Sequence, residues 1–168
     1  IRTFFNLLGP LTNPASANAH LLGVYDPDRL KQMAEVLREL GSTQAWIVHG
    51  HGGLDEISPS GPTKVAVLHH GSIREMSLSP HDFGFEPFSI DLVRGGDATE
   101  NAAIAHSVLA DEESPYRDLV LINSAAALVI ADKAANLRSA VELAQDSIRS
   151  KKALDTLLCW ARTSQEEE

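Results

Sequence analysis

Short apolar runs and one helical repeat predict how the first half of the chain folds. The runs 20–25 and 45–49 have the length and composition of buried strands. Between them, Asp26 and Pro27 are typical of a helix start, and Gly41 is typical of a helix end. Strand, helix and strand in succession predict a βαβ unit with parallel strands. The helix shows its apolar face at four positions: Leu30, Met33, Ala34 and Leu37.

The next segment predicts a β-hairpin. Residues 64–68 and 73–78 are strand-like, and the turn-forming sequence 69–72 separates them. Residues 79–87, which contain two prolines and a glycine, predict a loop. Together with the βαβ unit, this pattern predicts an α/β fold with a mixed, mostly parallel sheet flanked by helices.

The remainder of the chain predicts a C-terminal layer of helices. Asp97 with Glu100 three residues later predicts a capping box, and Ser114-Pro115 predicts the start of a long apolar helix that ends near Asp132. Two amphipathic helices follow, over about 137–148 and 154–161. The stretch 119–131, interrupted by Asn123 and Ser124, is shorter than the roughly 20 residues of a membrane span, so we expect a buried helix.

Composition narrows the classes of function. The 168 residues suit one domain, and 43% of them are hydrophobic, which is sufficient for a packed core. Fourteen basic against 23 acidic residues give a net charge of −9, which disfavours nucleic acid and anionic membranes as partners. The single cysteine, Cys159, excludes an intrachain disulfide and a cysteine-based zinc site. We expect it to be a packing residue in a cytoplasmic protein.

The candidate site is the segment His49–Glu56, which follows the second predicted strand. In open α/β sheets ligands bind beyond the carboxyl ends of strands, and glycines at 50, 52 and 53 allow tight turns and close approach. The adjacent acids Asp55 and Glu56 could share one Mg²⁺ whose other ligands are substrate phosphates and water. The alternative interpretation is an ordinary surface turn that ends in a capping acid.

Three further groups each allow a functional and a structural interpretation. His49 and His51 with Asp55 could bind a transition metal, but histidines that bond the backbone or line the loop are the simpler interpretation. Gly95-Gly96-Asp97 could bind an anion at a helix start, although Asp97 would repel it and favours a tight turn with a capping box. The polar residues around Gly9-Pro10 suit either a turn or a pocket: Asn6, Thr12 and Asn13.

Three motifs follow one another along the chain: RTFFNLLGPLTNPA at 2–15, HGHGGLDE at 49–56 and GGDATENA at 95–102. Taken together, in this order and at this separation, they resemble the anthranilate phosphoribosyltransferase family of tryptophan biosynthesis. Each motif alone is moderately specific, and the three together are a strong indication. The resemblance extends over essentially the whole chain.

This resemblance implies a glycosyltransferase that moves the 5-phosphoribosyl group of phosphoribosyl pyrophosphate to the amine of anthranilate. It implies a homodimer with a fold shared with pyrimidine nucleoside phosphorylases. It assigns Asp55 and Glu56 to Mg²⁺ and places Gly9 and Pro10 beside the anthranilate channel. No residue is assigned as a general base, because the aniline nitrogen is already nucleophilic.

The resemblance also implies that residues 1–168 are the C-terminal portion of the phosphoribosyltransferase α/β domain. The family's helical N-terminal domain and its Gly-Thr-Gly-Gly-Asp pyrophosphate loop are absent from this sequence. We therefore expect the chain alone to be inactive and to associate through exposed sheet edge and apolar surface. The alternatives are a pyrimidine nucleoside phosphorylase-like enzyme and a non-catalytic, nucleic-acid-binding relative, which the charge of −9 disfavours.

Overall fold

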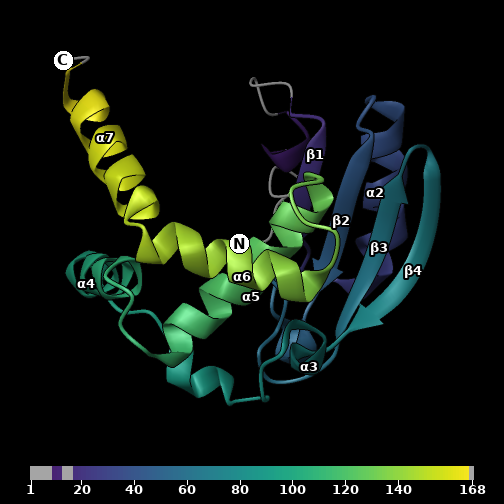
Figure 1. Cartoon of the computed structure of the whole chain (residues 1–168). Coiled ribbons are helices and arrows are strands. Elements are labelled where there is room, and N and C mark those ends of the chain that lie inside the picture. The colour runs from purple at the N-terminus through teal and green to yellow at the C-terminus, as the bar shows by residue number, and fades with distance from the viewer. Residues whose placement is uncertain (1–8, 13–16, 167–168) are drawn as a thin grey trace.

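Four strands form one sheet in the computed structural model, which describes residues 9–12 and 17–166 (Figure 1). The strands lie in chain order: β1 (Ala19–Gly23), β2 (Gln44–His49), β3 (Thr63–His69) and β4 (Ser72–Leu78). β1 and β2 are parallel, whereas β2–β3 and β3–β4 are antiparallel. The mixed sheet, the βαβ unit and the hairpin are confirmed. The expectation of a mostly parallel sheet is wrong for the described strands, because only the β1–β2 connection carries the crossover helix that parallel pairing requires.

Helices cover both faces of the sheet, which explains why the central strands β2 and β3 are buried on both sides. α2 (Leu30–Glu39) packs on one face, where Ala45 and Ile47 of β2 meet it. α5 (Pro115–Ile130) and α6 (Leu137–Arg149) cover the other face, where Trp46 and Val48 point. Alternate residues of β2 therefore enter different cores, as the period of two in a strand requires.

The helix boundaries follow the predicted caps. The Asp26 side chain accepts a hydrogen bond at the start of the 3₁₀ turn η2 (Pro27–Arg29), which leads into α2, and Gly41 follows α2 with φ +90°. Asp97 and Glu100 form the predicted capping box of α4 (Ala98–Leu109), and Ser114 caps α5. The remaining elements are η1 (Gly9–Leu11), η3 (His51–Gly53), α3 (Pro80–Phe83), η4 (Ile90–Val93) and α7 (Lys152–Glu166).

Three expectations need correction. The predicted loop 79–87 contains the short helix α3, because Ser79 and Asp82 form a capping box. Cys159 is exposed rather than packed, because α7 extends away from the other helices (Figure 1). α5 is not covered all round, since Val120 is 41% exposed. The helix predicted from Phe4–Leu8 lies outside the described residues.

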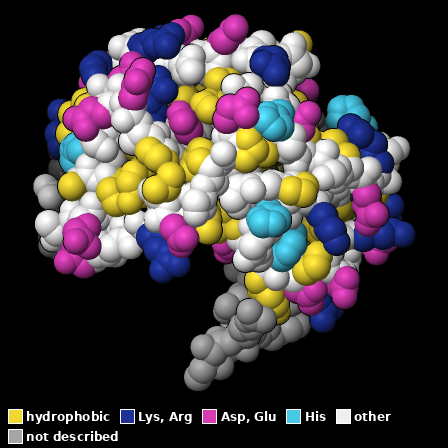
Figure 2. All heavy atoms as spheres, turned by 90° about the horizontal axis from the view of Figure 1, so that it is seen from below, with side chains coloured by type: hydrophobic (Ala, Val, Ile, Leu, Met, Phe, Trp, Pro, Cys, Tyr) yellow, Lys and Arg dark blue, Asp and Glu magenta, His cyan; other side chains and the backbone are white. Residues whose placement is uncertain are grey.

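The surface is mixed in charge. On the face drawn in Figure 2, Lys and Arg side chains are scattered among Asp and Glu side chains, with apolar side chains between them. Among the described residues, no helix is both long enough and apolar enough to cross a membrane.

Candidate functional site

The site begins where the two parallel strands end. Gly23, the last residue of β1, pairs with Val48, and the Val24 N–H donates to the Val48 carbonyl at 2.9 Å. The segment 50–62 then leaves β2 at the same edge of the sheet. This is the position at which α/β sheets collect ligands, as the sequence predicts.

A tight loop turns the chain back immediately after β2. Gly52 and Gly53 have φ of +80° and +83°, a region in which residues with a Cβ are strained. The Gly50 N–H donates to the Leu54 carbonyl at 2.8 Å, and the Gly53 N–H donates to the Gly50 carbonyl at 3.1 Å. These bonds close the loop and place the next two residues, Asp55 and Glu56, beside the carboxyl ends of β1 and β2.

Close packing against two other glycines fixes the backbone of the acidic pair. A Cβ added at Gly23 would overlap the carbonyl oxygen of Asp55. A Cβ added at Gly50 would overlap the carbonyl oxygen of Glu56. The ends of β1 and β2 therefore hold the two acids at a separation from the sheet that only glycine permits.

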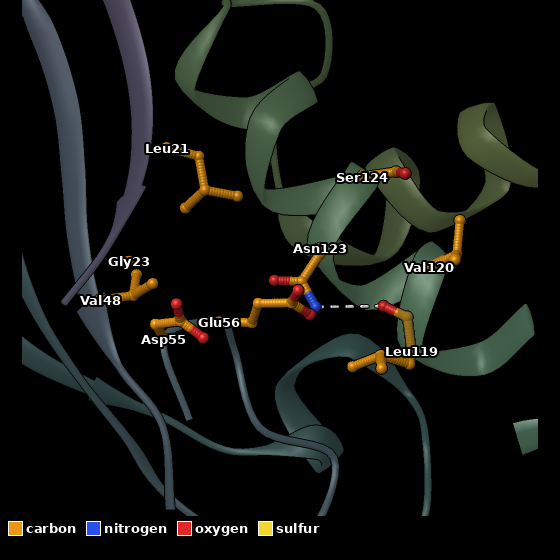
Figure 3. Close-up of a pocket in the computed structure, with 9 residues that line it drawn as sticks. All are labelled: Leu21, Gly23, Val48, Asp55, Glu56, Leu119, Val120, Asn123 and Ser124. Atoms are coloured by element: carbon orange, nitrogen blue, oxygen red, sulfur yellow. Dashed lines mark hydrogen bonds between the residues drawn. The ribbon is translucent and has the colours of Figure 1, made fainter. Parts of the chain in front are cut away.

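The other wall of the site is α5. Ile57, which follows the acidic pair, is fully buried, and its N–H donates to Oδ1 of Asn123 at 3.0 Å. The sequence pattern did not predict a role for Asn123, which stood out only as a polar interruption in an apolar helix. A pocket of about 450 Å³ lies between the strand ends and α5 (Figure 3). Its lining consists of Leu21, Gly23, Val48, Asp55, Glu56, Leu119, Val120, Asn123 and Ser124.

Glu56 and Asp55 give this pocket a negative wall. Desolvation raises the pKa of Glu56, and the neighbouring Asp55 carboxylate raises it further. Among the described residues, no Lys or Arg forms an ion pair with either acid. Both residues remain exposed, so a cation can reach them. Two adjacent carboxylates without a basic partner fit a hard divalent cation that takes its other ligands from water and phosphate.

The histidines of the loop have structural partners. Nδ1 of His49 lies 2.9 Å from the Val24 carbonyl, and Nδ1 of His51 lies 3.3 Å from the Ser60 hydroxyl. This confirms the interpretation of histidines that bond the backbone and line the loop. Within the described ranges, no group of three or more His, Cys, Asp and Glu side chains is arranged to hold a metal.

The glycine pair before α4 is a structural turn. The Gly96 N–H donates to Oδ1 of Asn101 at 2.9 Å, and the Asp97 N–H donates to Oε2 of Glu100 at 3.0 Å. These two N–H groups are therefore satisfied by side chains of α4 rather than left for an anion. The capping interpretation of Gly95-Gly96-Asp97 is confirmed.

Gly9 and Pro10 lie in η1, ahead of β1, and Leu11 packs against the core on the α2 face. The side chain of Thr12 donates back to the Gly9 carbonyl at 3.3 Å. The role that the resemblance gives to Gly9 and Pro10 stays a prediction, and Asn6 and Asn13 lie outside the described residues.

Comparison with known proteins finds similarity to anthranilate phosphoribosyltransferases. An anthranilate phosphoribosyltransferase of Agrobacterium fabrum is 51% identical over 93% of the chain and 45% of its own length. The crystal structure of that enzyme from Thermus thermophilus superposes with a TM-score of 0.81 at 37% identity, covering 92% of this chain and 45% of that one. The Saccharomyces cerevisiae enzyme in complex with PRPP and Mg gives 0.85 at 33% identity, covering 94% and 46%.

The chain spans about half the length of the curated relatives it matches. The family model described as "Glycosyl transferase family, a/b domain" matches residues 1–154, and the structural neighbours agree with this match. The chain therefore belongs to the a/b domain of the glycosyl transferase family.

Proposed function

We propose that the full-length protein containing this chain is an anthranilate phosphoribosyltransferase. It transfers the 5-phosphoribosyl group of phosphoribosyl pyrophosphate to the amine of anthranilate and releases pyrophosphate. The observation that carries this proposal is the position of Asp55 and Glu56, held in a pocket at the ends of β1 and β2 in a chain 51% identical to such an enzyme.

The chemistry explains why carboxylates stand at a site for a polyanion. A bond forms from the anthranilate nitrogen to C1 of the ribose while the bond from C1 to the pyrophosphate oxygen breaks, and the amine loses a proton. Asp55 and Glu56 would hold Mg²⁺, which disperses the charge developing on the leaving group. Without a cation between the carboxylates and the pyrophosphate, the two acids would repel the pyrophosphate.

The site assignments belong to this proposal. Asp55 and Glu56 are the Mg²⁺ ligands of this chain, and Gly9 and Pro10 border the anthranilate channel. Residues 1–168 form the C-terminal portion of the phosphoribosyltransferase α/β domain, and the 168-residue chain alone is inactive. The full-length protein is a cytoplasmic homodimer. The structure of the yeast relative with PRPP and Mg supports the choice of donor and metal.

A double substitution of the acidic pair in the full-length protein tests the proposal. Asp55→Asn/Glu56→Gln should abolish Mg²⁺-dependent loss of anthranilate fluorescence while the circular dichroism spectrum stays unchanged. Glu112→Gln/Glu113→Gln, an exposed neighbouring pair, is the matched control and should retain the wild-type rate. Wild-type turnover by the Asp55/Glu56 variant would contradict the proposal.

The comparisons do not favour the two alternatives. A nucleoside phosphorylase would release base from uridine or thymidine with phosphate, and a nucleic-acid-binding relative would bind single strands with a steep dependence on salt. We expect neither activity. Either one, in the absence of anthranilate consumption, would replace the proposed function.

A further inference from the structure

One side chain of α5 makes both backbone hydrogen bonds of the residue that follows the acidic pair. Oδ1 of Asn123 accepts from the Ile57 N–H at 3.0 Å, and Nδ2 donates to the Ile57 carbonyl at 3.2 Å. Nδ2 also donates to the Leu119 carbonyl at 3.1 Å, within α5. The amide thus uses its acceptor and both donor hydrogens, and it joins residues 66 positions apart.

The two ends of this contact differ in what supports them. The part of α5 that carries Asn123 is anchored in the core, since Ile122 and Ala125 are fully buried. The segment 51–56 is a mostly exposed loop outside the sheet, and an isolated bridge between Gly50 and Leu54 closes it. The rigid helix therefore positions the loop, and the loop does not position the helix.

The contact acts on Glu56 through the peptide that it shares with Ile57. The Ile57 N–H belongs to the peptide group whose carbonyl is that of Glu56, and that carbonyl oxygen packs against Gly50. Asn123 on one side and Gly50 on the other leave this peptide plane one orientation. Figure 3 shows the result, with the Glu56 side chain extending from the loop toward Asn123 across the pocket.

We propose that Asn123 is a positioning residue for the acidic pair: by holding the backbone of Ile57 it sets the direction from which Glu56 meets a divalent cation. This inference rests on the proposed Mg²⁺ role of Asp55 and Glu56. An apolar residue at position 123 would fill the same space but would leave the Ile57 N–H and carbonyl without partners. Loss of the contact should loosen the cation site rather than remove its ligands.

Substitution in the full-length protein tests the inference with Mn²⁺ as the probe. Free Mn²⁺ is measured by electron paramagnetic resonance in the presence of phosphoribosyl pyrophosphate, and the Mg²⁺ concentration for half-maximal rate is measured in parallel. Asn123→Ala should raise the dissociation constant for Mn²⁺ and the Mg²⁺ concentration for half-maximal rate by about tenfold each. This is the effect usual for residues that orient metal ligands. Hydrogen exchange at the Ile57 amide should accelerate.

Asn101→Ala is the matched control, because Asn101 makes the same pair of bonds to the backbone N–H and carbonyl of Gly96. It removes an equivalent amide contact far from the acids along the chain and should leave the Mn²⁺ affinity at the wild-type value. If Asn123→Ala does not fold, Asn123→Gln, which keeps the amide but moves it by one carbon, is compared in its place.

The outcomes separate the two proposals. Mn²⁺ binding that is lost in Asp55→Asn/Glu56→Gln but equal in the Asn123 and Asn101 variants would overturn the positioning role and leave the metal site standing. Mn²⁺ binding that is unaffected by the Asp55/Glu56 substitutions would overturn the metal site, and the positioning role with it. Binding that is lost in the Asp55/Glu56 variant, weaker in the Asn123 variant and unchanged in the Asn101 variant supports the inference.

Discussion

At the scale of single residues, the folded protein disfavours the ionised form of Glu56. Its pKa is raised in the folded protein, first by desolvation and then by Asp55. At pH values above 4.5, the ordinary pKa of a glutamate, Glu56 is therefore more easily ionised in the unfolded chain than in the folded protein. Stability is then lost as the pH rises through the folded pKa. Without divalent cations, Glu56→Gln should melt at a higher temperature than the wild type at pH 7.

The same comparison at lower pH gives the sign check. The difference in melting temperature between Glu56→Gln and the wild type should shrink as the pH falls toward 4.5 and vanish below it, because Glu56 is then protonated in both states. Thermal unfolding followed by circular dichroism measures it. Equal melting temperatures at pH 7 would show that the surroundings of the Glu56 carboxylate do not disfavour its ionisation.

Gly23 lets the backbone of the acidic loop approach β1 more closely than a residue with a side chain would allow. Because a Cβ there would overlap the Asp55 carbonyl oxygen, Gly23→Ala must displace either β1 or the acidic loop. Urea denaturation should show a loss of about 1–3 kcal/mol, the range for overpacked sites. Gly9→Ala, where the added Cβ meets no described atom within 4 Å, should change stability by less than about 0.5 kcal/mol.

At the scale of elements, the sequence predicts those features whose signals are local. The capping box at Asp97, the start of α5 at Ser114 and the hairpin all appear where short motifs place them. The contact of Asn123 could not be predicted, because its partner lies 66 residues away and the only local signal is a polar residue in an apolar helix. The exposure of Cys159 was missed for a related reason: an apolar pattern predicts a face but not what covers it.

The cap of α4 gives a prediction at this scale. Oδ1 of Asp97 accepts from the Glu100 N–H at 2.9 Å, and Glu100 completes the box. Asp97→Ala should lower the free energy of unfolding by about 1 kcal/mol. Asp91→Ala, which removes an exposed ion pair with Arg94 and a hydrogen bond from the Ser89 hydroxyl at 3.4 Å, should cost less than that. Equal losses in the two variants, measured by urea denaturation, would show that the cap contributes no more than a surface pair.

At the scale of the whole molecule, two features of the described surface point to association. β1 lies at the edge of the sheet, with only β2 as a described neighbour. A groove of about 950 Å³ runs along α5, α6 and the start of α7, and is lined mainly by apolar residues such as Leu128 and Leu143. Such surfaces are uncommon on isolated soluble monomers. Outside the groove, α7 exposes two further large apolar side chains, Leu158 and Trp160, and Trp160 is 71% exposed.

The 168-residue chain should therefore self-associate in solution, with the groove as the contact surface. Sedimentation velocity at rising micromolar concentration should show a shift toward dimer or larger species. Val120→Lys/Leu143→Lys, which places two charges in the groove at residues 41% and 42% exposed, should restore a monomer. Leu40→Lys/Leu92→Lys adds the same charge at exposed leucines outside the groove and should associate like the wild type. A wild-type chain that stays monomeric throughout would contradict the prediction, whereas association lost equally in both variants would attribute it to net charge instead of the groove.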